Sequence, residues 1–156
     1  MLRLGVFGVI VISVVAFLGF ARASNAAHRP VQHTCGLTDQ QFLAVYSLQL
    51  QAVGMYGNDF LSGAAKAQDA ISAAKEAAMA VGSSAPFDPS LQTVKHLAPP
   101  MFLEFGRAVK ARASGKDASA SAAMYRAYSL STRVQEVLHE AQPALTPLGC
   151  NVADVL

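Results

Sequence analysis

Charged residues are scarce in this 156-residue sequence, at 14% of the chain, and their balance argues against one class of function. The formal net charge is +2, from 12 Lys and Arg against 10 Asp and Glu. Two of the basic residues, Arg3 and Arg22, fall in a predicted N-terminal leader, so the rest of the chain has no formal net charge. Binding to a phosphate backbone requires a concentrated basic surface. We therefore expect no nucleic-acid partner.

The sequence also lacks the motifs of common enzyme and cofactor classes. It contains no G-x-S-x-G around Ser83 or Ser84, no G-x-G-x-x-G and no Walker loop. The stretch from His139 to Pro143 begins like a zinc-protease helix, but proline stands where the second histidine is needed. No catalytic residue and no metal site is predicted, and Glu104 is expected on the solvated face of its helix.

Cysteine is limited to Cys35 and Cys150, near the two ends of the chain. Two cysteines without nearby histidine pairs cannot complete a tetrahedral zinc site, and their separation excludes a C-x-x-C redox motif. An even number of cysteines in an exported protein favours a disulfide. The sequence therefore predicts a Cys35–Cys150 bond within one chain.

The export prediction comes from the N-terminus. Met1-Leu2-Arg3 is a short positive segment, an uncharged run follows from Leu4 to Phe20, and Ala21-Arg22-Ala23 offers small residues at both positions that a signal peptidase requires. Residues 1–23 are predicted to be a signal peptide, with an uncleaved membrane anchor as the alternative. We divide the remainder into a flexible lead-in, 24–37, and a helical domain, 38–156. The predicted location is extracellular, periplasmic or in the cell envelope.

Helical periodicity runs through the rest of the chain and predicts an all-α fold. A capping box, Thr38-x-x-Gln41, marks the first helix, and Asp88-Pro89 supplies a cap and a first-turn proline further on. The doublet Pro99-Pro100 is expected to interrupt the helical pattern. The expected helices span about 38–53, 59–81, 89–97, 100–113 and 117–142.

These spans predict an up-down four-helix bundle with one extra short helix, and with the termini joined by the disulfide. An unbroken helix from Asp39 to Val81 would leave three long helices and put the chain ends at opposite poles. We therefore interpret Gly54–Gly57 as a turn.

Two of the expected helices have wider apolar faces than a simple bundle needs. At 100° per residue, the face of the first covers about 220° and that of the fourth about 200°. Such faces are either covered by the short helix and the C-terminal tail or available for binding. The candidate binding surface is formed by Leu43, Tyr46, Leu48, Leu50, Met101, Phe102, Leu103 and Phe105.

Tyr128 and His139 share a boundary face of the last expected helix and are candidate ligand contacts. No cofactor is predicted. Haem is the alternative, because helical bundles can hold it with axial His, Met or Tyr. The layout of an exported helical domain with one cysteine near each end resembles small secreted haem-binding proteins of mycobacteria, without a shared motif.

The sequence predicts a non-enzymatic exported protein that binds a protein partner or an apolar small molecule. An enzyme of unrecognised type is the alternative.

Overall fold

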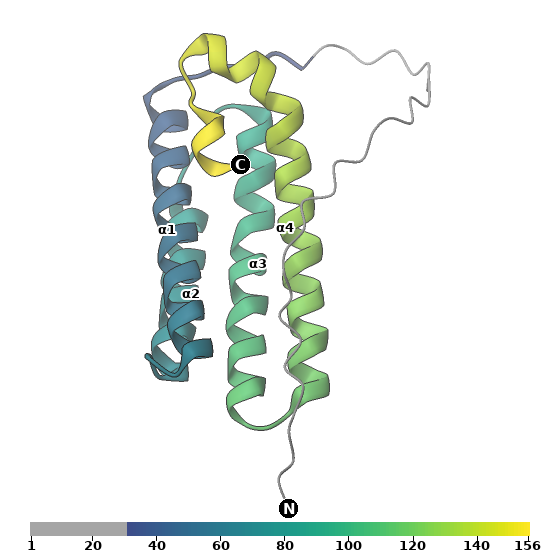
Figure 1. Ribbon diagram of the computed structural model, residues 1–156. Coiled ribbons are helices and arrows are strands. Elements are labelled where there is room, and N and C mark those ends of the chain that lie inside the picture. Colours follow the sequence, from purple (N-terminus) through teal and green to yellow (C-terminus); the bar gives the residue numbers. More distant parts are fainter. Residues whose placement is uncertain (1–30) are drawn as a thin grey trace, which may run out of the picture. The chain divides into compact units, whose positions relative to one another are not determined.

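The computed structural model describes residues 31–156, which form four α-helices and two short 3₁₀ helices (Figure 1). The predicted signal peptide and the first part of the predicted lead-in lie outside this range. The α-helices are α1 (Leu37–Ser62), α2 (Ala67–Ser83), α3 (Pro89–Ala113) and α4 (Asp117–Leu145), and the tail contains η1 (Thr146–Leu148) and η2 (Val152–Val155). No strand occurs in this part of the chain. The predicted all-α four-helix fold is confirmed.

The helices pack in chain order, α1 on α2, α2 on α3 and α3 on α4. They alternate in direction, so the start of α1 and the end of α4 lie at the same pole (Figure 1). The tail turns back at that pole, and η2 contacts both α1 and α4. Its valines, Val152 and Val155, are buried there. The tail therefore links the first helix of the bundle to the last.

The disulfide between Cys35 and Cys150 is confirmed and joins the tail to the segment before α1. The two Cα atoms are 5.8 Å apart, and the cysteines are separated by 115 residues. Restricting the unfolded chain with a loop of this length stabilises the fold by about 5 kcal/mol in the chain-entropy treatment. The crosslink thus holds the pole at which both ends of the bundle meet.

The predicted turn at Gly54–Gly57 is wrong, because α1 continues through both glycines. The chain turns at Gly63, which has a φ of 80° and whose N–H donates to the carbonyls of Asp59 and Phe60. Such a left-handed terminus is the common use of glycine after a helix. Gly57 serves close packing instead, since a Cβ there would lie 2.7 Å from the ring of Phe105 on α3. The bundle keeps its four helices because a turn is still present.

The predicted interruption at Pro99-Pro100 is also wrong, and the short helix expected before it forms the first part of α3. Each proline removes one backbone donor, which usually breaks a helix. The buried face nevertheless keeps its helical phase across the doublet, from Val94 and Ala98 to Met101 and Phe102. Packing on both sides holds α3 together. The additional helical turns of the fold are η1 and η2.

Two helix ends lie at other residues than predicted. α1 begins at Leu37, with Gly36 as its N-cap, so Thr38 does not cap it. The Asp39 side chain instead accepts a hydrogen bond from the Gly36 backbone N–H at 2.9 Å. At the other end of the chain, α4 passes Pro143 and ends at Leu145, which is fully buried. Asp88 caps α3 as predicted.

The core lies along the bundle axis and is built from one face of each helix. α2 contributes mainly alanines, which allow its neighbours to approach closely. Larger side chains come from the other helices and include Phe42, Leu91, Phe102, Leu138 and Leu145. No helix of residues 31–156 is both long and apolar enough to span a bilayer.

Candidate binding surfaces and the disulfide pole

The structure divides the predicted apolar binding surface between the core and two separate surface grooves. Six of its eight residues are in or against the core: Leu43, Tyr46, Met101 and Phe102 are buried, and Leu50 and Phe105 are partly buried. The remaining two are exposed, Leu48 at 61% and Leu103 at 41%. The excess apolar width of α1 and α3 is therefore mostly covered, and Leu48 and Leu103 mark the parts that stay open.

Tyr46 shows how the covered part is built. Its ring is parallel to that of Phe42 at 6.2 Å between centroids, and it is tilted against Phe102 at 6.3 Å. Burial raises the pKa of the Tyr46 hydroxyl by penalising the phenolate. A tyrosine held neutral among aromatic rings belongs to the packing of the bundle.

Tyr128 and His139, the candidate ligand contacts, are both exposed on α4. They are separated by eleven residues, which corresponds to about 16 Å along a helix. Side chains at this separation are too far apart to bind one ion together. Within residues 31–156, no three His, Cys, Asp or Glu side chains gather as a metal site would require.

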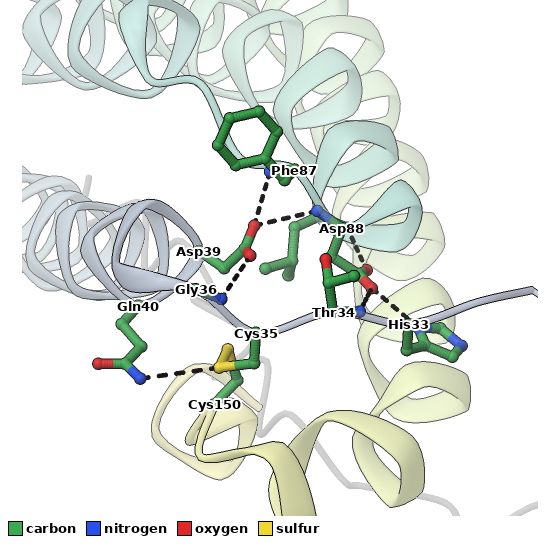
Figure 2. The surroundings of a disulfide bond; sticks show 10 residues. His33, Thr34, Cys35, Gly36, Asp39, Gln40, Phe87, Asp88 and Cys150 are labelled. Atoms are coloured by element: carbon green, nitrogen blue, oxygen red, sulfur yellow. Dashed lines mark hydrogen bonds and ion pairs between the residues drawn. A yellow bond between two sulfur atoms is a disulfide. The ribbon is translucent and has the colours of Figure 1, made fainter.

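The disulfide pole contains two fully buried carboxylates, Asp39 and Asp88 (Figure 2). One oxygen of Asp39 accepts hydrogen bonds from the backbone N–H groups of Phe87 and Asp88, at 2.7 and 3.0 Å. The other oxygen accepts from Gly36. Asp39 therefore connects the start of α1 to the loop that joins α2 and α3.

Asp88 makes the converse link, from the start of α3 to the segment before α1. Its Oδ1 accepts from the backbone N–H groups of Ser90 and Leu91, which caps α3. Its Oδ2 accepts from the Thr34 N–H at 3.1 Å and lies 3.0 Å from Nδ1 of His33 (Figure 2). Each oxygen of both carboxylates thus accepts hydrogen bonds from groups that hold the fold.

The expectation that Glu104 is solvated is wrong. Glu104 is buried at 9% exposure between α3 and α4, and its carboxylate pairs with Arg107 and with Arg126, the latter at 2.9 Å. Both arginines are more than half exposed. The two positive partners compensate for the burial of the charge, so Glu104 acts as a bridge between the helices.

The first open site, which we call the tail groove, lies between α1 and the C-terminal tail. It has a volume of about 370 Å³, and both Leu48 and Leu43 line it. Ser47, also in the groove, donates a 3.5 Å hydrogen bond to the Asp154 carbonyl of η2. The lining consists of Gln40, Leu43, Ala44, Ser47, Leu48, Gln51, Gly149, Asn151, Asp154 and Val155. Polar and apolar side chains both line this groove, so it suits a surface contact better than an enclosed apolar ligand.

The second open site, which we call the basic groove, lies between α2 and α3 and has a volume of about 330 Å³. It is lined by Gln68, Ile71, Ala74, Lys75, Leu103, Gly106, Arg107 and Lys110. Three of these side chains are cations and none is an acid. The sequence analysis did not identify this groove, because its two walls come together only when α2 packs antiparallel on α3. The available signal was the spacing of Leu103, Arg107 and Lys110 along one helix face.

Comparisons of the chain with protein-family models, with curated proteins and with solved structures found no match.

Proposed function

We propose that this chain is an exported, non-enzymatic helical-bundle protein that acts by binding a protein partner through the tail groove. The observation that carries the proposal is Leu48, a leucine left 61% exposed inside an open groove. A single exposed apolar side chain is ordinary on a protein surface, but Leu48 lies in one open groove with Leu43, Ala44 and Val155, and apolar surface gathered in a groove is a feature of interaction sites.

The tail groove has a defined shape because its rim is held by covalent and polar links. The Cys35–Cys150 bond fixes the tail to the segment before α1, and η2 buries Val152 and Val155. A rim that is ordered before binding reduces the entropy lost on association. This supports recognition of a partner by a preformed surface.

Export is supported by the predicted leader and by the disulfide. A bond between cysteines persists in oxidising compartments and is rare in the reducing cytosol. The proposal places the mature chain, beginning at Ser24, in the cell envelope or outside the cell.

The proposal is tested with Leu48→Glu, and Leu61→Glu serves as the matched control. Leu61 is also an exposed leucine of α1, at 77%, but it does not line the tail groove. Both substitutions should change the free energy of unfolding by no more than about 0.5 kcal/mol, because neither side chain is in the core.

Each tagged variant is expressed in its own host, and the envelope and medium fractions are analysed by native mass spectrometry. We expect wild type and Leu61→Glu to carry the same protein partner, and Leu48→Glu to lose it. Equal recovery of the partner by all three proteins would refute the role of the tail groove. Recovery of a chain that still begins at Met1, or of free thiols, would refute the export of a cleaved, disulfide-bonded form.

A further inference from the structure

We propose that the basic groove is a second interaction site, which binds an acidic amphipathic helix of a partner protein. It shares no residue with the tail groove. The inference goes beyond the proposed function, and its test uses a defined peptide, so either proposal can fail while the other stands.

The charge of the groove is the first argument. Lys75 stands on the α2 wall, and Arg107 and Lys110 stand on the α3 wall, with no carboxylate in the lining. Within residues 31–156, Lys75 and Lys110 take part in no ion pair. Arg107 pairs with Glu104, whose second oxygen binds Arg126 of α4. Cations gathered in a groove produce a positive potential that favours an anionic partner.

The floor of the groove is apolar and is the second argument. A Cβ built on Gly106 would lie 3.3 Å from the Cβ of Ala74, so α2 and α3 approach closely at this point. Ile71 and Leu103 border this contact, and Leu103 is 41% exposed. Small residues at the closest approach, flanked by larger apolar ones, form a furrow that can receive the apolar side chains of a third helix.

The position of the cations along the groove suits a partner that carries more than one anionic group. The neighbours of Gly82 and Gly106 show the alignment: Gly82 faces Pro99, and Gly106 faces Ala74. With this antiparallel alignment, Lys75 and Lys110 lie on opposite walls and about 7 Å apart along the axis, at 1.5 Å per residue. Two carboxylates spaced along a partner can therefore each meet one of the lysines.

A helix with carboxylates on both sides of an apolar strip satisfies this pattern. Residues five apart on one helix point about 140° away from each other and are separated by about 7.5 Å along its axis, so they can lie on opposite sides of the strip at close to the offset of the two lysines. Leucines between the carboxylates would then contact Leu103 and Ile71. This is the helix-in-groove mode of recognition with charge complementarity at its edges.

The probe is a fluorescent, acetylated and amidated peptide of about 20 residues, long enough to form helix in water. It carries a leucine strip with glutamates on both sides, and a second peptide has glutamine in place of each glutamate. Anisotropy titrations are made with the disulfide-bonded residues 24–156. We expect saturable binding of the Glu peptide that weakens with added salt, and at least tenfold weaker binding of the Gln peptide.

The decisive variant is Lys75→Gln with Lys110→Gln, which should weaken binding of the Glu peptide about three- to tenfold, as expected for two exposed ion pairs. The matched control is Lys95→Gln with Lys116→Gln, which removes the same charge outside the groove and should leave the affinity unchanged. Amide shifts of the wild-type protein on titration should centre on Ile71, Lys75, Leu103 and Gly106.

Three results of the peptide experiments would overturn the proposal, and a fourth comes from vesicles. They are no binding of the Glu peptide at millimolar concentration, equal weakening by the two double variants, and amide shifts that centre outside the groove. Vesicles of phosphatidylglycerol and phosphatidylcholine provide the competing case of a lipid surface. If the Lys75 and Lys110 variant loses vesicle binding while peptide binding is unaffected, the groove contacts a membrane and the proposal of a helical partner is wrong.

Discussion

Replacing Asp39 by alanine measures how much the polar network at the disulfide pole contributes to the fold. Asp69 provides a matched control, because both aspartates occupy the third position of a helix and accept the N-cap N–H, Asp39 from Gly36 at 2.9 Å and Asp69 from Lys66 at 3.0 Å. The two sites differ in their surroundings. Asp69 is exposed, and Asp39 is fully buried.

The expected magnitudes follow from the number of donors that lose their acceptor. Asp69→Ala removes one solvated capping bond and should cost about 1 kcal/mol or less. Asp39→Ala also leaves the N–H groups of Phe87 and Asp88 without their acceptor. Hydrogen bonds to a charged group contribute about 1.5–3 kcal/mol each and are not additive, so we expect a loss of about 3–5 kcal/mol.

Urea unfolding at neutral pH, with the disulfide intact, measures the free energy of unfolding of both variants. Asp39→Asn keeps the shape of the side chain and one acceptor oxygen, and it should lie between wild type and Asp39→Ala. A cost for Asp39→Ala within about 1 kcal/mol of that for Asp69→Ala would refute the reasoning. Water would then be able to replace the Asp39 carboxylate as the acceptor for these N–H groups.

Two further predictions concern α1. Gly54→Ala should stabilise the protein by up to about 1 kcal/mol, because a Cβ at Gly54 meets no described atom within 4 Å and alanine favours a helix. Gly57→Ala should be less stable than Gly54→Ala by about 1–2 kcal/mol in the same urea assay, since its Cβ would displace the Phe105 ring. Destabilisation by both changes would instead indicate a turn there. Burial raises the pKa of Tyr46 above the unfolded value of 10.0, so the stability it contributes is full below pH 10 and is lost as the pH rises further. Tyr46→Phe should flatten the alkaline fall in unfolding free energy, and an unchanged fall would contradict this.

Prediction from the sequence succeeded where a feature depends on neighbouring residues, such as a helix cap, or on the number of helices. The Asp88-Pro89 cap opens α3 because the aspartate needs only the N–H groups of Ser90 and Leu91. An even number of helices brings Cys35 and Cys150 to one pole, and this holds although the first turn lies at Gly63 rather than at Gly54–Gly57.

Prediction failed where two local interpretations were equally good. A glycine can end a helix or allow close packing, and the role of Gly57 depends on Phe105, which is 48 positions further along the chain. Pro99-Pro100 lowers the stability of a helix locally, but the buried face of α3 continues across it. The apolar arcs of the candidate surface were measured on separate helices, so they could not show that most of that surface is covered.

By itself, the sequence determined the helical class, the disulfide and the composition of each helix face, because periodicity, caps and cysteine number act over short distances or on the whole chain. Tertiary structure alone decided which faces meet. It brought the N–H groups of Phe87 and Asp88 to Asp39, left Leu48 open beside the tail, and placed Lys75 across a groove from Lys110. These outcomes depend on contacts between residues distant in the chain, and the free energy of such contacts is set by packing, which no local pattern contains.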